Sequence, residues 1–142
     1  MKTYIEHINI AVADIQETIT FFQTAFPHFV IRGGAKNENE KWEWLHLGTN
    51  DTYIAINQAE ENSLGKRKLY ESAGFNHVGF VVTNAKQLAK RLEKAGYKSS
   101  YPTEYHQFRT RVYFFDKEGN DYEFVEYHSE KDEERNQYDG VK

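Results

Sequence analysis

Residues 6–12 and residues 76–82 have the same alternation of apolar and polar side chains. The apolar positions are Ile8, Ile10 and Val12 in the first copy and Val78, Phe80 and Val82 in the second. A period of two is typical of a β-strand with one apolar face. His7 and His77 are 70 positions apart and lie on the opposite face of their strands. We therefore expect one unit built twice, with a histidine at the same point of each copy.

A helical pattern follows each of these strands. Each pattern begins with a capping pair, Asp14 with Glu17 in the first copy and Asn84 with Gln87 in the second. Apolar residues then recur at helical spacing, at Ile15, Ile19, Phe22 and Phe26 and again at Leu88, Leu92 and Ala95. Pro27 ends the first helix, and Gly96 provides a left-handed C-terminal cap for the second.

Further β-type segments complete each half of the chain. They are residues 29–31, 42–47 and 53–57 in the first half, and a short run near Tyr97, residues 112–115 and residues 122–127 in the second. Turn-forming residues at 48–51 and 116–121 join the last two strands of each half as hairpins. Residues 33–41 and 58–74 are polar and charged, as is typical of loops or a short surface helix.

The order of elements is therefore β-α-β-β-β, twice. We expect an α+β fold in which two βαβββ modules form a curved mixed, mostly antiparallel sheet around a cavity, with each helix on the outer face. A single domain would span residues 1–128, with modules at about 1–60 and 75–128. Residues 129–142 would form a charged C-terminal tail that begins with a solvated helical turn.

Composition narrows the functional classes. The chain has 142 residues and a mild formal charge of −4, which gives no electrostatic footprint for nucleic acid. It has no cysteine, so disulfides and thiolate metal sites are excluded, and His, Asp and Glu are the possible metal ligands. The N-terminus lacks the apolar core of a signal peptide and no segment reaches membrane-spanning length, so we expect a cytoplasmic protein.

Three of these possible ligands are expected to point toward the inner face of the sheet. In residues 122–127, Glu123 shares its face with Val125 and Tyr127. If the two modules pack about a pseudo-two-fold axis, His7, His77 and Glu123 converge as two imidazoles and a carboxylate. Such a set leaves positions open on iron(II), manganese, nickel, cobalt or zinc. The alternatives are that Glu123 pairs with a basic residue across the sheet, or that Glu126 is the ligand.

With these residues, the chain resembles the vicinal oxygen chelate superfamily, which includes glyoxalase I, extradiol dioxygenases, fosfomycin-resistance transferases, methylmalonyl-CoA epimerase and bleomycin-binding proteins. The resemblance covers residues 5–127 and rests on the paired His7 and His77 strands and on the ending formed by Asp116, Gly119 and Glu123. It implies the doubled βαβββ fold, and a divalent metal held by His7, His77 and Glu123.

One position departs from the glyoxalase I pattern. Glyoxalase I and its nearest relatives take a second acid or amide ligand from the last strand of the first module, where Ala55 stands in this chain. Asn57 or Gln58 would provide at most a weak neutral contact. Since that extra glutamate also serves as the base in glyoxalase-type proton transfer, the departure argues against a strict glyoxalase I mechanism.

Residues 105–119, which lead into Glu123, resemble the extradiol dioxygenase signature, although Tyr105 and Lys117 depart from it. That resemblance makes His106 a candidate acid or base and Tyr113 a candidate hydrogen-bond donor to the substrate. The alternatives are a solvated loop position for His106 and sheet packing for Tyr113.

Further residues are candidates for contact with the substrate. Arg109 and Arg111 are expected on the same face of their strand as Tyr113. They would hold a carboxylate or phosphate of the substrate, or they would instead pair with the acidic tail. Trp42, Trp44 and His46 alternate on one face and would form a stacking wall or part of the core. Arg109, Arg111, Trp44 and Asn57 are our candidates for binding the substrate.

The resulting hypothesis is a metal-dependent enzyme that chelates adjacent oxygens of a small molecule. Glyoxalase-like or lyase chemistry and ring-cleaving dioxygenase chemistry both stay open, with a slight preference for the extradiol type. The alternative is a metal-free binding protein of the bleomycin-resistance type, which sequesters its ligand. We expect a homodimer, since a half-open sheet leaves an edge or face to cover. Whether one chain or two provide the site stays open.

Overall fold

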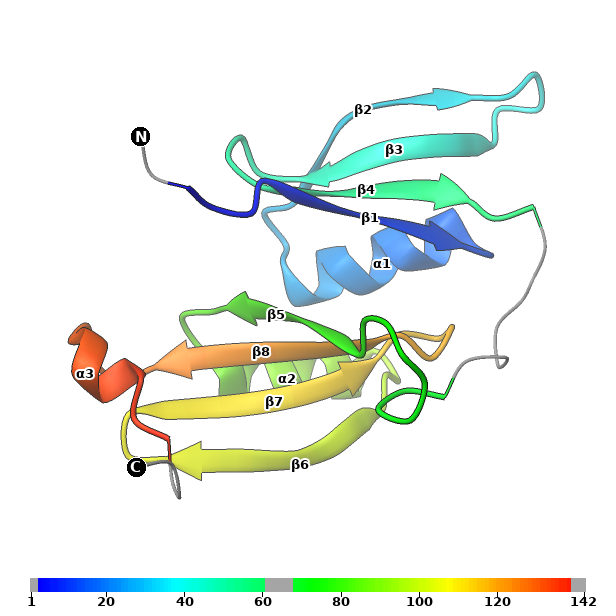
Figure 1. Ribbon diagram of the computed structural model, residues 1–142. Coiled ribbons are helices and arrows are strands. Elements are labelled where there is room, and N and C mark those ends of the chain that lie inside the picture. The colour runs from blue at the N-terminus through cyan, green and yellow to red at the C-terminus, as the bar shows by residue number, and fades with distance from the viewer. Residues whose placement is uncertain (1–2, 61–67, 139–142) are drawn as a thin grey trace. The chain divides into compact units, whose positions relative to one another are not determined.

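The chain forms two compact units, Met1–Arg67 and Lys68–Lys142. The computed structural model describes residues 3–60 and 68–138, and Figure 1 labels the strands and helices of each unit. The boundary falls in the polar segment between the two modules expected from the sequence. That both modules belong to a single domain stays a prediction.

The first unit is a four-stranded mixed sheet with one helix. Its elements are β1 (His7–Val12), α1 (Ile15–Ala25), β2 (Val30–Lys36), β3 (Trp42–Gly48) and β4 (Tyr53–Gln58). The strand order is β1-β4-β3-β2, in which β1 pairs with β4 in parallel and the other pairs are antiparallel. The two ends of the unit's chain segment therefore lie on neighbouring strands.

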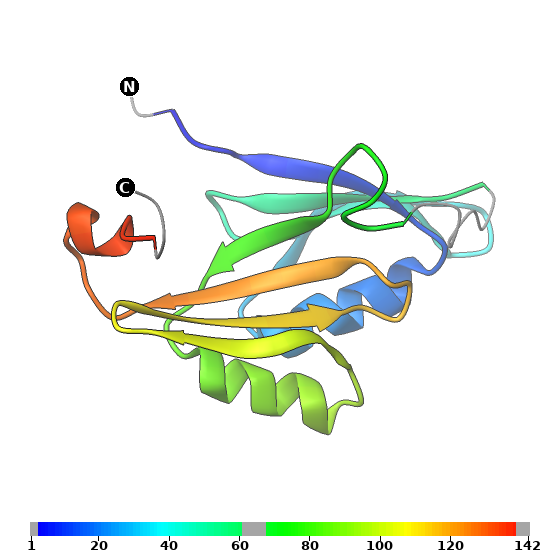
Figure 2. The same cartoon turned by 60° about the horizontal axis from the view of Figure 1, so that its bottom comes forward.

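The second unit repeats this plan. Its elements are β5 (His77–Val81), α2 (Ala85–Lys94), β6 (Ser99–His106), β7 (Arg109–Phe115), β8 (Asp121–Tyr127) and a short α3 (Asp132–Arg135). The strand order is β5-β8-β7-β6, with β5 parallel to β8, and Figure 2 shows α2 lying across one face of this sheet. The α+β class and the doubled βαβββ plan are confirmed.

Local sequence signals account for the helix ends. The Asp14 carboxylate accepts the backbone N–H of Glu17 at 3.0 Å, and the Asn84 side chain accepts that of Gln87 at 2.8 Å. Helix α1 ends at Ala25, two residues before Pro27. Gly96 has a φ of +89°, the left-handed conformation expected for it after α2.

In each unit, alternate strand positions are buried on the helix side of the sheet. The buried strand residues are Val12, Leu45, Leu47, Ile54 and Ile56 in the first unit and Val112, Phe114, Tyr122 and Phe124 in the second. Helix α1 adds Ile15, Ile19 and Phe22, and α2 adds Leu88 and Leu92. His7 and His77 are exposed in their strands, on the side that the alternation assigns to them.

Several strands are longer than the sequence pattern indicated, most of all β2 and β6. Strand β2 continues to Lys36, so the prediction of a loop over residues 33–41 is wrong for its first four positions. Gly34 explains the extension, because a Cβ there would lie 2.5 Å from the Trp44 carbonyl oxygen, and its absence lets β2 approach β3. Strand β6 reaches His106, so this histidine ends a strand and is not in a loop.

The segment that precedes β5 is only partly described. Of the residues predicted as loop at 58–74, Gln58 ends β4, residues 61–67 lie outside the described part, and residues 68–74 form turns. Tyr70 in this segment has a φ of +65°. A positive φ is unusual for a bulky side chain.

Strand register identifies the equivalent positions of the two units. Asn9 pairs with Ala55 between β1 and β4, and Gly79 pairs with Glu123 between β5 and β8, two residues after each histidine. Ala55 is therefore the counterpart of Glu123, as the sequence indicated, and the first unit has no carboxylate there.

The turn between β7 and β8 should contribute to stability. The buried Asp116 carboxylate accepts the backbone N–H groups of Glu118 and Asn120, both at 2.9 Å, and the Asn120 side-chain amide at 2.8 Å. Replacing Asp116 with alanine removes these acceptors, and we expect a loss of about 1–3 kcal/mol in the free energy of unfolding.

Urea denaturation measures this loss. The matched control is Asp51→Ala, at an exposed position of the corresponding turn in the first unit, for which we expect a change of about 0.5 kcal/mol or less. Equal effects of the two substitutions would contradict the assigned role of Asp116.

No helix within the described residues is long and apolar enough to cross a membrane.

Candidate functional site

Most of the candidate site residues in the second unit lie on the sheet face turned away from α2. Along β8, the side chains of Tyr122 and Phe124 are buried on the α2 side. Glu126 has the same parity, and its carboxylate accepts the backbone N–H of Ala85 at 2.8 Å, at the start of α2. Glu123 therefore projects from the other face, and Glu126 is occupied in capping the helix.

His77 and Glu123 are in direct contact on this face. His77 Nε2 lies 3.0 Å from Glu123 Oε2, and the side chain of Glu123 is only 14% exposed. The parallel register brings them together, because Asp121 pairs with His77 and Glu123 pairs with Gly79. Two of the three ligand candidates are thus adjacent.

Tyr70 contacts the other nitrogen of the His77 ring. The Tyr70 hydroxyl oxygen lies 2.9 Å from His77 Nδ1, and its O–H donates to Asp121 Oδ2 at 2.8 Å. The other oxygen of Asp121 accepts the Ser100 hydroxyl at 2.5 Å. Although 62% of the residue is exposed, desolvation of its hydroxyl, followed by the hydrogen bond to Asp121, raises the pKa of Tyr70 to about 12. The Tyr70 hydroxyl therefore keeps its proton at neutral pH.

These contacts assign the protons of His77. Tyr70 has one proton and gives it to Asp121, so its oxygen accepts from His77 Nδ1–H. In a neutral imidazole, Nε2 then carries a lone pair that faces a carboxylate oxygen at 3.0 Å. Two electron pairs at this distance require a positive charge between them, which is either a proton or a metal cation.

Arg111 connects Glu123 to a second carboxylate. Its Nε lies 3.1 Å from Glu123 Oε1, and its terminal nitrogen donates to Glu104 Oε2 at 3.0 Å. Burial lowers the pKa of Arg111, but the hydrogen bond to Glu104 and the nearby charge of Glu123 raise it overall. This guanidinium, a candidate for binding an anionic substrate, is already paired with two carboxylates.

Tyr113 lies beside this pair. It is opposite Glu123 in the β7–β8 register, and its hydroxyl donates to Glu104 Oε2 at 3.0 Å. Burial and the charge of Glu123 raise the pKa of Tyr113 well above its ordinary value. Tyr113 is therefore neutral, and its one proton is already donated to Glu104.

Arg109 and His106 lie at the other end of β6 and β7. They pair with each other in register, and Arg109 also pairs with Tyr127, four residues beyond Glu123. Arg109 is 4% exposed, donates to the backbone carbonyl of Arg135 at 3.2 Å and packs on the Tyr138 ring. The tail thus covers Arg109, and the structure does not bring His106 beside His77.

In the first unit, aromatic rings gather around Tyr53 on the exposed face of the sheet. His7 stacks on Tyr53 with centroids 4.8 Å apart, and His46 stacks on it at 4.5 Å. The Arg32 guanidinium lies 4.2 Å from the centroid of the same ring. Trp44 is 41% exposed, and its ring centroid lies 5.3 Å from that of His46, so it forms part of an aromatic surface.

In His7, as in His77, Nε2 is the ring nitrogen that is left for a further ligand. Its Nδ1 lies 2.9 Å from Glu6 Oε2, so a neutral His7 that donates to this carboxylate has its lone pair on Nε2. Asn57, a candidate for contacting the substrate, donates its side-chain amide to Asn9 Oδ1 at 3.0 Å.

A family model describes almost the whole of this chain. Residues 4–124 match the glyoxalase/bleomycin resistance protein/dioxygenase superfamily. The chain belongs to this superfamily. A search of curated proteins returns no match.

Solved structures of the superfamily share the fold. The fosfomycin resistance protein FosX from Listeria monocytogenes aligns at 20% identity, with 95% of this chain and 99% of that chain covered and a TM-score of 0.68. A glyoxylase/bleomycin resistance protein/dioxygenase domain from Frankia sp. aligns at 16% identity, with 90% and 100% covered and a TM-score of 0.70. A glyoxalase family protein from Enterococcus faecalis aligns at 20% identity, with 86% and 96% covered and a TM-score of 0.65.

Superfamily members commonly use divalent metals, and His77 and Glu123 provide two donor atoms of the kinds that such ions bind. In octahedral coordination, two neighbouring ligand atoms that are each about 2.1 Å from the cation are about 3.0 Å apart. This equals the distance of 3.0 Å from His77 Nε2 to Glu123 Oε2. Within the described residues, however, no three His, Cys, Asp or Glu side chains form a group that would hold a metal.

Sequence reasoning missed three residues of this network. Tyr70 lies in the polar segment that was interpreted as a loop, and Glu104 lies in a strand that was predicted to be shorter. Asp121 had a usable signal, since it shares the face of Glu123 and begins the same strand. Its parallel pairing with His77 became visible only with the sheet order.

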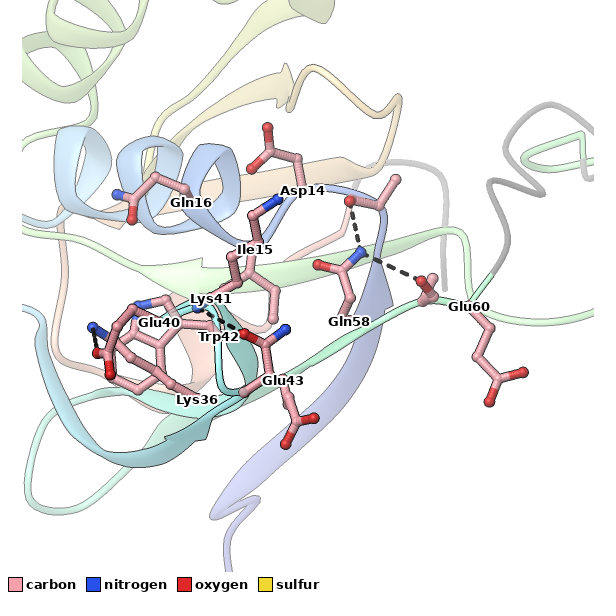
Figure 3. Close-up of a pocket in the computed structure, with 13 residues that line it drawn as sticks. Asp14, Ile15, Gln16, Lys36, Glu40, Lys41, Trp42, Glu43, Gln58 and Glu60 are labelled. Carbon is pink, nitrogen blue, oxygen red and sulfur yellow. Dashed lines mark hydrogen bonds and ion pairs between the residues drawn. The ribbon is translucent and has the colours of Figure 1, made fainter.

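A separate polar pocket of about 790 Å³ lies at the start of α1 in the first unit (Figure 3). Lys36 pairs there with Glu40 at 3.6 Å and lies over the Trp42 ring. Gln58 donates to the backbone carbonyl of Ala13 at 2.8 Å. Among the described residues, no histidine lines this pocket, so it does not coincide with the candidate metal ligands.

Proposed function

We propose that this protein is a metal-dependent enzyme whose divalent ion binds adjacent oxygens of a small substrate. The observation that carries the proposal is the orientation of His77. Its Nδ1 is engaged by Tyr70, and its Nε2 faces the carboxylate of Glu123 at 3.0 Å. This arrangement of a second partner behind a histidine ligand is common in metalloproteins.

Local charge supports the same proposal. Glu104, Asp121 and Glu123 bring three carboxylates to one sheet face, and Arg111 provides the guanidinium that contacts two of them. With a neutral His77, this cluster has an excess of negative charge. A divalent cation would neutralise that excess, whereas an anionic substrate alone would be repelled.

We propose His77 and Glu123 as two metal ligands, and His7 as the third. His7 is proposed from its equivalent strand position and from the Glu6 carboxylate that leaves its Nε2 available. Whether His7 acts with His77 of its own chain or of a second copy follows from the oligomeric state, for which we propose a homodimer.

Each residue of the network has a distinct role in this proposal. The bound ion would act as a Lewis acid on substrate oxygens as negative charge develops there. Arg111 holds Glu123 through Nε and fixes the direction of its other oxygen. Tyr113 keeps its proton and gives it to Glu104, so its oxygen would accept a hydrogen bond from a hydroxyl of the substrate on the same face. Trp44 and Asn57 are proposed substrate contacts of the first unit.

The chain favours some reaction classes over others. Ala55 stands where a glyoxalase I mechanism requires its extra glutamate, which argues against that reaction. His106 lies at the far end of β6 from the position that pairs with Tyr113, which reduces the support for an extradiol-type acid or base there. Inactivation of fosfomycin is a further candidate, since fosfomycin resistance proteins share the fold.

Metal removal tests the proposal. Elemental analysis of protein purified without added metal is expected to find a divalent ion in stoichiometric amount. Oxygen uptake with catechols, isomerisation of a hemithioacetal and loss of fosfomycin would be measured before and after treatment with a chelator. At least one activity should disappear on chelation and return when manganese, iron(II), nickel, cobalt or zinc is added.

The alternative function is metal-free sequestration of a small molecule, as in bleomycin-resistance proteins. It requires His77 to be protonated, with Nε2–H donating to Glu123 and Nδ1–H donating to Tyr70. Tight binding of bleomycin by protein that neither contains nor takes up metal would favour this function and contradict the enzyme proposal.

A further inference from the structure

We infer that Tyr70 and Asp121 form a positioning pair that orients His77 and directs its Nε2 lone pair toward the metal. This inference rests on the proposed function, because it assigns His77 as a ligand. It adds two residues from different segments, the turn before β5 and the start of β8, that do not themselves touch the ion.

The hydrogen-bond chain is continuous and has one direction. Ser100 donates to Asp121 Oδ1, Tyr70 donates to Asp121 Oδ2, and the Tyr70 oxygen is left to accept from His77 Nδ1–H. Asp121 is 5% exposed, so its carboxylate is a buried acceptor in a fixed place. The chain therefore selects the tautomer of His77 that has its proton on Nδ1.

Packing does not explain the position of Tyr70. The residue is 62% exposed, although its hydroxyl makes two hydrogen bonds. A tyrosine placed for core packing would bury its ring instead. The contact that defines Tyr70 is the one made by its hydroxyl.

The backbone at Tyr70 supports a specific role. Its φ of +65° is in the left-handed region, which costs a bulky residue conformational energy. The Asn76 side chain accepts the Tyr70 backbone N–H at 2.7 Å and holds this turn directly before His77. The chain thus maintains an unfavourable backbone conformation that places the hydroxyl beside the histidine ring.

Substitution of Tyr70 by phenylalanine tests the inference with two readouts. Zinc affinity, measured by competition with a chromophoric chelator, is expected to fall about 10- to 100-fold, as for other partners behind metal-bound histidines. The His77 Nδ1–H signal in nitrogen-15 NMR of the zinc-loaded protein should be protected from exchange in the wild type and lost in Tyr70→Phe.

A matched control and a second variant sharpen the test. Tyr101→Phe removes a hydroxyl from an exposed tyrosine of the same unit and should change neither readout. Asp121→Asn keeps the size of the side chain but removes its charge, and should weaken zinc binding in the same direction. Because both residues act through one hydrogen-bond chain, the double variant should lose less than the sum of the two effects.

The outcomes separate this inference from the proposed function. If His77→Ala weakens zinc binding but Tyr70→Phe changes neither affinity nor the Nδ1–H signal, the positioning role is overturned and the metal site stands. If His77→Ala leaves zinc affinity unchanged, both are overturned. A loss of zinc affinity on Tyr70→Phe with an unchanged Nδ1–H signal would also contradict orientation of the His77 ring.

Discussion

Replacing His77 with alanine is expected to reduce the affinity for a divalent metal by more than about 100-fold. Loss of a partner behind a ligand typically costs 10- to 100-fold, so loss of the ligand itself should cost more. The side chain is one third exposed, with 33% of its surface accessible, and its removal leaves no large cavity. The variant should therefore remain folded while it loses metal.

Isothermal titration with zinc and elemental analysis after purification measure this effect. His28→Ala is the matched control, since it removes an exposed imidazole that packs near Phe26 and Phe29 in the first unit. Circular dichroism in the presence of a chelator compares the folded state without any contribution from bound metal. Unchanged metal content in His77→Ala would refute the ligand assignment.

Glu123→Gln provides an independent test at the partner atom. The amide keeps the size of the side chain but lacks the negative charge that would bind the ion. We expect weaker metal binding, in the direction of His77→Ala. An unchanged affinity in this variant, together with a loss in His77→Ala, would show that another residue pairs with His77 on the metal.

Local signals in the sequence were sufficient to predict the repeated architecture. Alternation in residues 6–12 and 76–82 predicted β1 and β5, and the capping pairs at Asp14 and Asn84 predicted the start of both helices. Each of these signals depends on residues within a few positions of one another. Such short-range preferences are read from sequence without knowledge of the pairing of distant strands.

Pairing between distant segments explains what was missed. Strand β2 includes Gly33 and Gly34, which have no β-type pattern and are held in the sheet by their partners in β3. Contact between Tyr70 and Asp121 joins residues 51 positions apart. No local periodicity records such a contact, so the residues behind His77 emerged only when the strand order was known.

The two units show how one plan acquires two kinds of surface. Equivalent register positions hold His7 and His77, but Tyr53 stands opposite His7 where Asp121 stands opposite His77. In the first unit the Tyr53 ring stacks on the His7 imidazole. In the second unit the Asp121 carboxylate is linked to the His77 imidazole through the Tyr70 hydroxyl. The first unit therefore offers one candidate ligand and an aromatic surface, and the second offers a ligand pair with its charge network.

Replacing Phe124 with alanine is expected to lower the free energy of unfolding by about 3–5 kcal/mol, the usual range for deletion of a buried aromatic ring. Phe124 is 0% exposed, and its ring stacks on Phe80 with centroids 6.0 Å apart. It lies on the α2 side of β8, opposite to the face that carries Glu123. The loss therefore comes from the core of the second unit and not from the metal ligands.

Urea denaturation with a chelator present measures this loss without a contribution from metal. Phe75→Ala is the matched control, because it removes the same ring from a position that is 88% exposed, and its effect should be within about 0.5 kcal/mol of zero. Hydrogen exchange in the Phe124 variant should accelerate in β5, β7, β8 and α2. A loss below about 1 kcal/mol would contradict the burial of Phe124, because a fully enclosed ring cannot be removed from a packed core at so small a cost.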